Sequence, residues 1–234
     1  MKLIAALGGL MLTFPVLADS IIVNGTRFIY KGNEKELTVQ LSNTAERPSL
    51  AQVWLDNGDA TITPDKITTP FIINPPISRI DSHSGQVIRI KLNAGNSLPQ
   101  NKESLWWINV LDIPGASKAD KAPEGIGVFK MAVRSRFKLI YRPEPLSGRV
   151  SAIAKLRLQP AGTALTLTNP TPFYITVATI SQGRGEPINT EAVMIAPQSS
   201  QTINLRQAVR AGEELTLEEI NDYGALAKSK TRAG

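Results

Sequence analysis

The side chains best suited to specific recognition lie in residues 127–141. In an extended strand, alternate side chains point to opposite faces. One face would carry Phe129, Met131, Val133, Ser135, Phe137, Leu139 and Tyr141, and the other Val128, Lys130, Ala132, Arg134, Arg136, Lys138 and Ile140. The first face is apolar and the second is mostly basic, so the strand could pair with a partner protein and also contact anionic groups.

A strand over these residues would be about 50 Å long at about 3.3 Å per residue, which exceeds the usual length. One small sandwich cannot cover it along its whole length. The pattern fits either a long edge strand whose apolar face is all core, or a strand with one end offered to a partner by strand addition. Nucleic-acid binding by the basic face is disfavoured, because the aromatic residues lie on the opposite face.

The sequence offers little for catalysis. It has one histidine and no cysteine, which excludes a cysteine nucleophile and any site that needs two imidazoles. His83 lies in a predicted turn, residues 81–85, and we expect it to be exposed there. No phosphate-binding loop, dinucleotide fingerprint, nucleophile elbow or metal-ligand spacing is present. We therefore predict no enzyme activity, no catalytic residue, no metal and no cofactor.

Composition indicates a folded protein. The 234 residues are 42% hydrophobic and 20% charged, which is typical of one or two globular domains. No apolar run after the N-terminus approaches the roughly 18 residues of a membrane span, so we expect no membrane insertion. The formal charge of +6 leaves anionic partners open.

The first 18 residues are predicted to be a cleavable secretory signal. Lys2 supplies a positive charge, residues 3–14 are apolar or small, and the Val-Leu-Ala of residues 16–18 precedes Asp19. The alternative is a buried N-terminal helix. A secreted chain without cysteines is compatible with the periplasm, where disulfides are permitted but not required.

Short strands dominate the rest of the chain. Period-two alternation of apolar and polar residues is clearest at residues 37–41, 87–92, 164–168 and 173–180. Asn-Gly, Asn-Pro and Ser-Gly pairs separate such segments. Pro143 and Pro145 cannot lie in a central strand, so we predict a stiff linker that divides an immunoglobulin-like domain at 19–142 from a second at 143–234, with a cleft between them.

Two charged groups near the C-terminus have no predicted role. We expect the acidic group to form a solvated face or turn; it comprises Glu213, Glu214, Glu218 and Glu219. We expect the basic tail to be disordered; it comprises Lys228, Lys230 and Arg232.

Five stretches resemble the periplasmic pilus chaperones of Gram-negative bacteria. They occur in family order over nearly the whole chain: residues 24–30 (NGTRFIY), 98–114 (LPQNKESLWWINVLDIP), 134–143 (RSRFKLIYRP), 169–174 (NPTPFY) and 220–224 (INDYG). Gly115 is a small departure, because the family usually has proline or another small residue there. The resemblance implies an all-β protein of two immunoglobulin-like sandwiches in a boomerang arrangement. It also implies a periplasmic chaperone that stabilises pilus, or fimbrial, subunits and delivers them to an outer-membrane usher.

The resemblance further implies specific roles for residues. Arg27 and Lys138 would lie in the cleft and bind the C-terminal carboxylate of a subunit. By donor-strand complementation, Phe129, Met131 and Val133 would fill the gap left by a strand that the subunit lacks. A one-residue slip would present the opposite face instead. A free chaperone could cap the same strand by pairing with a second copy.

The resemblance also bears on the hinge and on the subclass. Asp112, Arg142 and Asp222 would form an ion-pair network that locks the two domains. Residues 114–127 form a loop of only 14 residues, and the second domain has no cysteine. Both features resemble the short-loop subclass of the family.

Two other functions compete with this one. The first is a secreted sandwich that binds carbohydrate, as an adhesin or a pilus subunit; a subunit would lack a strand, whereas this chain is predicted to hold two full sandwiches. The second is a periplasmic hydrolase that uses His83, for which the sequence supplies no identifiable partner residues.

Overall fold

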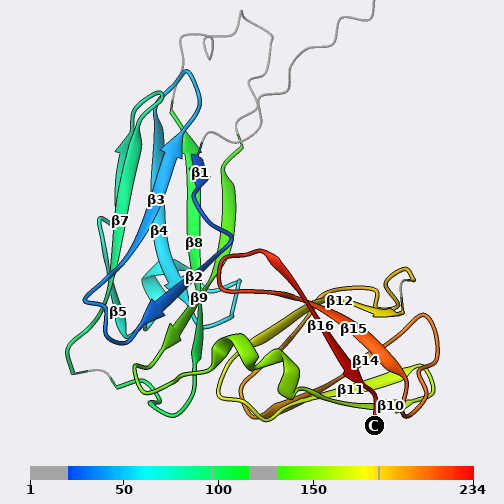
Figure 1. The fold of residues 1–234 in the computed structure, drawn as a ribbon. Coiled ribbons are helices and arrows are strands. Elements are labelled where there is room, and N and C mark those ends of the chain that lie inside the picture. The colour runs from blue at the N-terminus through cyan, green and yellow to red at the C-terminus, as the bar shows by residue number, and fades with distance from the viewer. Residues whose placement is uncertain (1–20, 96, 116–130, 184) are drawn as a thin grey trace, which may run out of the picture.

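The computed structural model describes residues 21–95, 97–115, 131–183 and 185–234. These residues form two β-sandwiches that meet at an angle (Figure 1), as expected for two immunoglobulin-like domains. The predicted signal segment, most of the loop at 114–127 and Phe129 lie outside the described residues. Among the helices of the described ranges, none is long and apolar enough to cross a membrane.

The N-terminal domain packs a four-stranded sheet against a five-stranded one. The first sheet has the order β1 (Ile21–Val23), β3 (Leu37–Asn43), β7 (Gly85–Leu92) and β5 (Phe71–Asn74). The second has the order β2 (Arg27–Lys31), β9 (Val133–Arg142), β8 (Ser104–Pro114), β4 (Ser49–Asp56) and β6 (Ile77–Ile80). A short 3-10 helix, η1 (Pro64–Lys66), lies in the connection between β4 and β5.

The period-two prediction is confirmed in this domain. Val39 and Leu41 of β3 and Ile88 and Ile90 of β7 are all at most 1% exposed, while polar residues alternate with them. Burying side chains of this size contributes about 1.5–3 kcal/mol each. His83 occupies the turn before β7, as expected, and is exposed, with its Nε2 3.0 Å from Glu46 Oε1.

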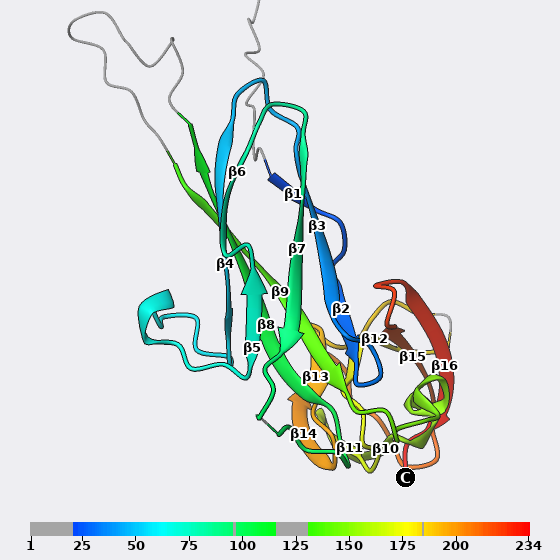
Figure 2. The same cartoon turned by 90° about the vertical axis from the view of Figure 1, so that its left-hand side faces the viewer.

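Strand β9 is shorter than the strand predicted over 127–141. Met131 and Ala132 are described but are not in a strand, and β9 begins at Val133. From there β9 pairs antiparallel with β8 along its length, and the two run side by side through the domain (Figure 2). β2 pairs with β9 in parallel, but only at residues 138–142.

The C-terminal domain packs a three-stranded sheet against a four-stranded one. The first has the order β10 (Arg157–Ala161), β11 (Ala164–Asn169) and β14 (Ser199–Asn204). The second has the order β13 (Val193–Ile195), β12 (Ile175–Gln182), β15 (Glu214–Ile220) and β16 (Leu226–Arg232). Two 3-10 helices, η3 (Arg149–Ser151) and η4 (Ile153–Lys155), precede β10.

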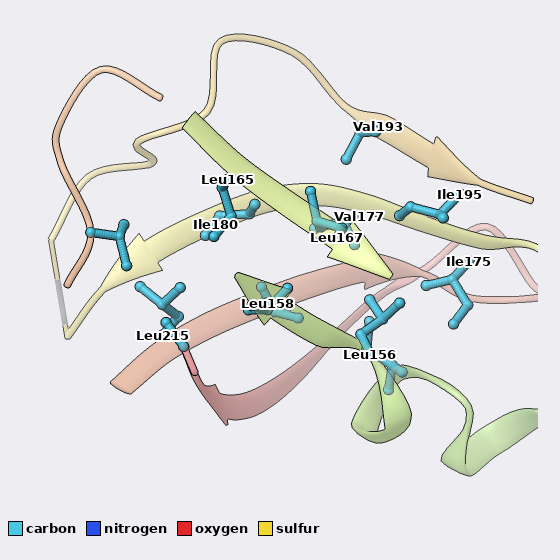
Figure 3. Packing of buried hydrophobic residues seen from close by; sticks show 14 of the residues in the cluster. Leu156, Leu158, Leu165, Leu167, Ile175, Val177, Ile180, Val193, Ile195 and Leu215 are labelled. Atoms are coloured by element: carbon cyan, nitrogen blue, oxygen red, sulfur yellow. The ribbon is translucent and has the colours of Figure 1, made fainter. Parts of the chain in front are cut away.

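The core of this second sandwich is aliphatic. Leu165 and Leu167 of β11 and Ile175 and Val177 of β12 are fully buried, and they point into the space between the two sheets (Figure 3). This core shares no member with the core of the N-terminal domain. Each domain therefore has its own buried interior, while the exact boundary predicted after Arg142 stays a prediction.

The expected disorder of the basic tail was wrong. Residues 226–232 form β16, which pairs with β15 over its whole length. The strand is held by backbone pairing and by two cross-strand ion pairs, Lys228–Glu218 at 3.3 Å and Lys230–Glu214 at 2.8 Å. Ala233 then packs into the core with only 1% of its surface exposed. The basic side chains of this segment therefore lie on the exposed face of a strand, and they do not indicate a disordered C-terminus.

Candidate functional site

Two cations lie side by side where the domains meet. Arg27 of β2 is directly opposite Lys138 of β9 in the parallel register. A guanidinium nitrogen of Arg27 donates a hydrogen bond of 2.8 Å to the carbonyl oxygen of Ile220, at the end of β15 in the C-terminal domain. Both cations therefore belong to the N-terminal domain, and the C-terminal domain binds one of them, Arg27.

Neither cation of this pair forms a salt bridge with a carboxylate of the described residues. Within the described part of the chain, no carboxylate oxygen lies within 4 Å of Arg27 or Lys138. Burial, followed by the charge of Arg27, lowers the pKa of the Lys138 ammonium. Burial, followed by the charge of Arg149, lowers the pKa of Arg27. The negative charges of Asp222 and Glu219 oppose this shift of Arg27 without forming a salt bridge to it. Two half-buried cations with no salt-bridge partner among the described residues form a site suited to a carboxylate.

Beside the cation pair, part of one edge of β9 has no partner among the described strands. β2 covers this edge only at residues 138–142, and no described strand pairs with it at residues 133–137. Met131, just before the strand, has 61% of its surface exposed, and Val133 is half-buried. The apolar residues predicted to enter a partner thus adjoin a strand edge that can accept another strand. Phe129 lies outside the described residues.

Arg142, at the end of β9, connects the two domains. Its Nε donates a 2.6 Å hydrogen bond to Glu103, and its terminal nitrogens donate bonds of 2.7 and 2.9 Å to Asp222. The second oxygen of Glu103 accepts a 2.6 Å bond from the backbone N–H of Tyr174. One guanidinium therefore joins a carboxylate before β8 to a carboxylate after β15 with a bidentate geometry.

The pKa values of the two carboxylates of this network shift in opposite directions. Burial raises the pKa of Glu103, although the charge of Arg142 opposes this shift. Burial also acts to raise the pKa of Asp222, but hydrogen bonds and charge from Arg142 outweigh it and lower that pKa. Removing Arg142 would leave Glu103, whose side chain is wholly buried, without its cation.

A second ion pair lies next to the first. Arg149 of η3 is 3.2 Å from Glu219 and 3.6 Å from Asp222, and all but 9% of its side chain is buried. The expectation that Glu219 belongs to a solvated acidic face was wrong, since Glu219 is 4% exposed. Glu219 shares the inward face of β15 with Leu215 and Leu217, so alternation along the strand places it inside.

The structure does not bring Asp112 into the hinge, and that prediction was wrong. Asp112 is opposite Val133, whereas Arg142 lies beyond the opposite end of the β8–β9 pairing, next to Glu103. Nine residues of strand, about 30 Å, separate Asp112 from Glu103. Asp112 instead accepts hydrogen bonds from the backbone N–H of Ile21, at 3.0 Å, and from the Ser49 hydroxyl.

The turn at residues 221–225 approaches the N-terminal domain closely. A Cβ atom on Gly224 would lie 2.5 Å from the Thr26 hydroxyl oxygen, and Gly224 has a φ of +80°. Both features favour glycine at this position, because a side chain would strain the backbone and require Thr26 or the turn to shift. Glycine therefore allows Asp222 to reach Arg142 while the next residues pass Thr26.

Comparisons with known proteins identify the family of both domains. Residues 20–147 match the family model described as "Pili and flagellar-assembly chaperone, PapD N-terminal domain". Residues 151–231 match "Pili assembly chaperone PapD, C-terminal domain". The chain belongs to the pilus-assembly chaperone family.

Individual relatives agree over nearly the full length of this chaperone. It is 57% identical over 225 residues to chaperone protein MrkB of Klebsiella pneumoniae, covering 96% of both chains. Its structure resembles the Pseudomonas aeruginosa CupB2 chaperone, with a TM-score of 0.76 at 31% identity, covering 91% of this chain and 100% of that one. A chain from the complex of Salmonella enterica SafA pilin with the SafB chaperone gives a TM-score of 0.78 at 25% identity, covering 93% and 98%.

Glu103 is the hinge residue of this chaperone that sequence reasoning missed. It precedes β8 directly, and the pairing of Ser104 with Tyr141 sets it beside Arg142. The β8–β9 register would have identified it, because the partner of a residue near a strand end follows from the pairing of its neighbours. Arg142 and Asp222 were both selected, and the structure brings them together.

Replacing Arg142 with alanine should destabilise the fold strongly. The buried Glu103 carboxylate would either take up a proton or stay unpaired, which costs about 3–5 kcal/mol in the free energy of unfolding. Urea unfolding followed by tryptophan fluorescence would measure this. Arg79→Ala is a matched control, because Arg79 pairs with Asp81 on the surface with both side chains 70% exposed, and should cost at most about 1 kcal/mol. Equal losses in the two variants would contradict a structural role for the network.

Proposed function

We propose that this protein is a periplasmic chaperone that binds and stabilises pilus subunits by donor-strand complementation and delivers them to an outer-membrane usher. The observation that carries the proposal is that Arg27 and Lys138, directly opposite each other, form no salt bridge with a described carboxylate and lie beside an edge of β9 that no described strand pairs at residues 133–137. Binding of this kind needs neither catalysis nor a cofactor. The signal-like residues at 1–18 support export to the periplasm.

The cation pair anchors the end of the subunit in this proposal. A terminal carboxylate placed between Arg27 and Lys138 would accept charge-assisted hydrogen bonds, each contributing about 1.5–3 kcal/mol. Because both cations are fixed to paired strands, the anchor also defines where the last subunit strand begins against β9. The anchor therefore sets the register of the added strand.

The apolar row before and within β9 supplies much of the affinity. Burying Phe129, Met131 and Val133 in a subunit groove would contribute about 1.5–3 kcal/mol each. The 61% exposure of Met131 in the free chain supports this assignment, because its apolar surface is not used by the chaperone's own core. A slip of one residue would present Ala132 and Arg134 to the groove, which links affinity to register.

An apolar patch on the N-terminal domain supports contact with the usher. Ile77 of β6 is 54% exposed and Leu50 of β4 is 39% exposed. In the sheet, Leu50 is opposite Ile113 of β8, and its neighbour Gln52 is opposite both Ile77 and Leu111. Neighbouring apolar side chains on an outer sheet face are typical of protein contacts.

In the absence of a subunit, a second copy of the chaperone could pair with the edge of β9 that no described strand covers.

Lys138→Ala should abolish stable capture of a pilus subunit. The variant removes one of the two cations, a loss of roughly 10- to 150-fold in affinity for a carboxylate. Co-purification of a tagged chaperone with the subunit encoded beside it would measure the effect. Lys91→Ala is a suitable control, since Lys91 is an exposed lysine 3.1 Å from Glu36. Full capture by Lys138→Ala would show that the anchor is assigned incorrectly.

Subunit capture should weaken in alkali because Lys138 must stay protonated. Its pKa lies below the ordinary value of 10.5. As the pH rises through this lowered pKa, the ammonium loses its charge and the carboxylate loses a partner. Affinity for the subunit, measured from pH 7 to pH 10.5, should fall in the wild type. Lys138→Arg should retain capture to higher pH, because a guanidinium stays charged. Superimposable pH profiles for the two proteins would contradict this role.

Met131→Glu should weaken subunit binding without unfolding the free chaperone. Burial of the methionine side chain would be lost, which corresponds to roughly a 10- to 150-fold weaker complex. Thermal melting of the free protein should be unchanged, since Met131 is exposed. Ala132→Glu introduces the same charge on the adjacent exposed residue and should affect capture much less. A large drop in the melting temperature of Met131→Glu would place Met131 in the core.

A further inference from the structure

Trp107 lies in line with the cation pair across four strands. Asp56 of β4 is opposite Trp107 of β8, Trp107 is opposite Lys138 of β9, and Lys138 is opposite Arg27 of β2. Residues that are directly opposite one another share a face of the sheet. The indole ring is therefore the neighbour of Lys138 on the side away from Arg27.

Two cations lie over the Trp107 ring. The Lys138 Nζ is 5.7 Å from the ring centroid, and the Arg136 Cζ is 4.7 Å from it. Both distances fall within the range of a cation–π interaction. No described carboxylate lies within 4 Å of the Lys138 ammonium. The negative face of the indole ring is therefore its favourable electrostatic contact, in the place of a salt bridge.

The ring itself has a fixed support. Arg136 is 2.7 Å from an oxygen of Asp56, whose side chain is wholly buried. The other Asp56 oxygen accepts a 2.7 Å hydrogen bond from the Asn109 amide. Arg136, held in this way, is the cation that lies over one face of the Trp107 ring.

The anchor needs such support before a subunit arrives. Arg27 and Lys138 carry like charges directly opposite each other, which is unfavourable across paired strands. Arg27 is held by the carbonyl oxygen of Ile220, but a lysine has a flexible four-carbon chain. Without a contact on its far side, the Lys138 ammonium would move away from Arg27 and would have to be reordered on binding, which reduces affinity.

We propose that Trp107 is a positioning residue of the carboxylate anchor, whose ring holds the Lys138 ammonium in place for the subunit's terminal carboxylate. This role rests on the proposed function of Arg27 and Lys138. Trp107 contacts the anchor lysine and not the carboxylate itself. Its effect is therefore confined to ligands that end in a free carboxylate.

Two synthetic peptides that copy the last strand of a pilus subunit test this role. One ends in a free carboxylate and the other in an amide, and calorimetric titration of the full chaperone with each gives an acid-to-amide affinity ratio. In the wild type this ratio measures how much the terminal carboxylate contributes to the affinity. Trp107→Leu should lower the ratio by about 2- to 30-fold, and Trp107→Phe, which keeps a ring, should restore part of it.

Trp54→Leu is the matched control. Trp54 is on the same sheet face and carries Arg134 at 4.9 Å from its ring centroid, but it contacts neither anchor residue. Its ratio should equal that of the wild type. If Trp107→Leu keeps the wild-type ratio, or if both variants lower it equally, Trp107 is not a positioning residue. If the wild type binds acid and amide equally, the anchor itself is wrong.

Nuclear magnetic resonance of the free protein provides a readout that needs no subunit. The ε-methylene protons of Lys138 should be shifted upfield by the indole ring in the wild type and in Trp54→Leu. Trp107→Leu should return them to the position of an ordinary exposed lysine. Should Trp107→Leu fail to fold, unshifted Lys138 protons in the wild type would by themselves overturn the proposal.

Discussion

The register between β8 and β9 is the constraint on which the site depends. It pairs Ser104 with Tyr141 and so sets Glu103 beside Arg142, and it pairs Trp107 with Lys138. A shift of one residue would turn every side chain of β9 to the other face of the sheet. The hinge and the cation pair would then be lost together, although no residue would have changed. The buried apolar side chains of both strands hold this register, because half of each strand faces the core.

The geometry of the hinge and the geometry of the cation pair are linked. Asp222 binds Arg142, while Ile220, two residues earlier, accepts the hydrogen bond from Arg27. The same short segment of the C-terminal domain therefore fixes the angle between the domains and one of the two cations. A movement of the domains relative to each other would break the hydrogen bond between Arg27 and Ile220 and release the Arg27 side chain. The ion pairs at the hinge thus support binding as well as stability.

Much of the fold followed from local pattern, and the failures have a common cause. Alternation identified β3, β7 and β11, because one face of each is buried and the other is polar. β16 was missed because its outward side chains are mostly charged, and only pairing with β15 makes it a strand. Asp112 was placed in the hinge by the family resemblance, and Glu103 was not considered, because the distance of either acid from Arg142 depends on long-range pairing. The alternation of apolar and polar residues along the chain predicts which side chains are buried. Which residues face each other across a sheet depends on the register of the strands, which alternation does not give.

The turn at Gly224 links a local backbone conformation to the contact between the two domains. A Cβ atom here would lie 2.5 Å from the Thr26 hydroxyl oxygen, so any side chain would require the threonine or the turn to shift. A shift of the turn would move Asp222, two residues earlier, relative to Arg142. A substitution at this glycine would therefore act on the interdomain ion pair, although Gly224 itself takes no part in it.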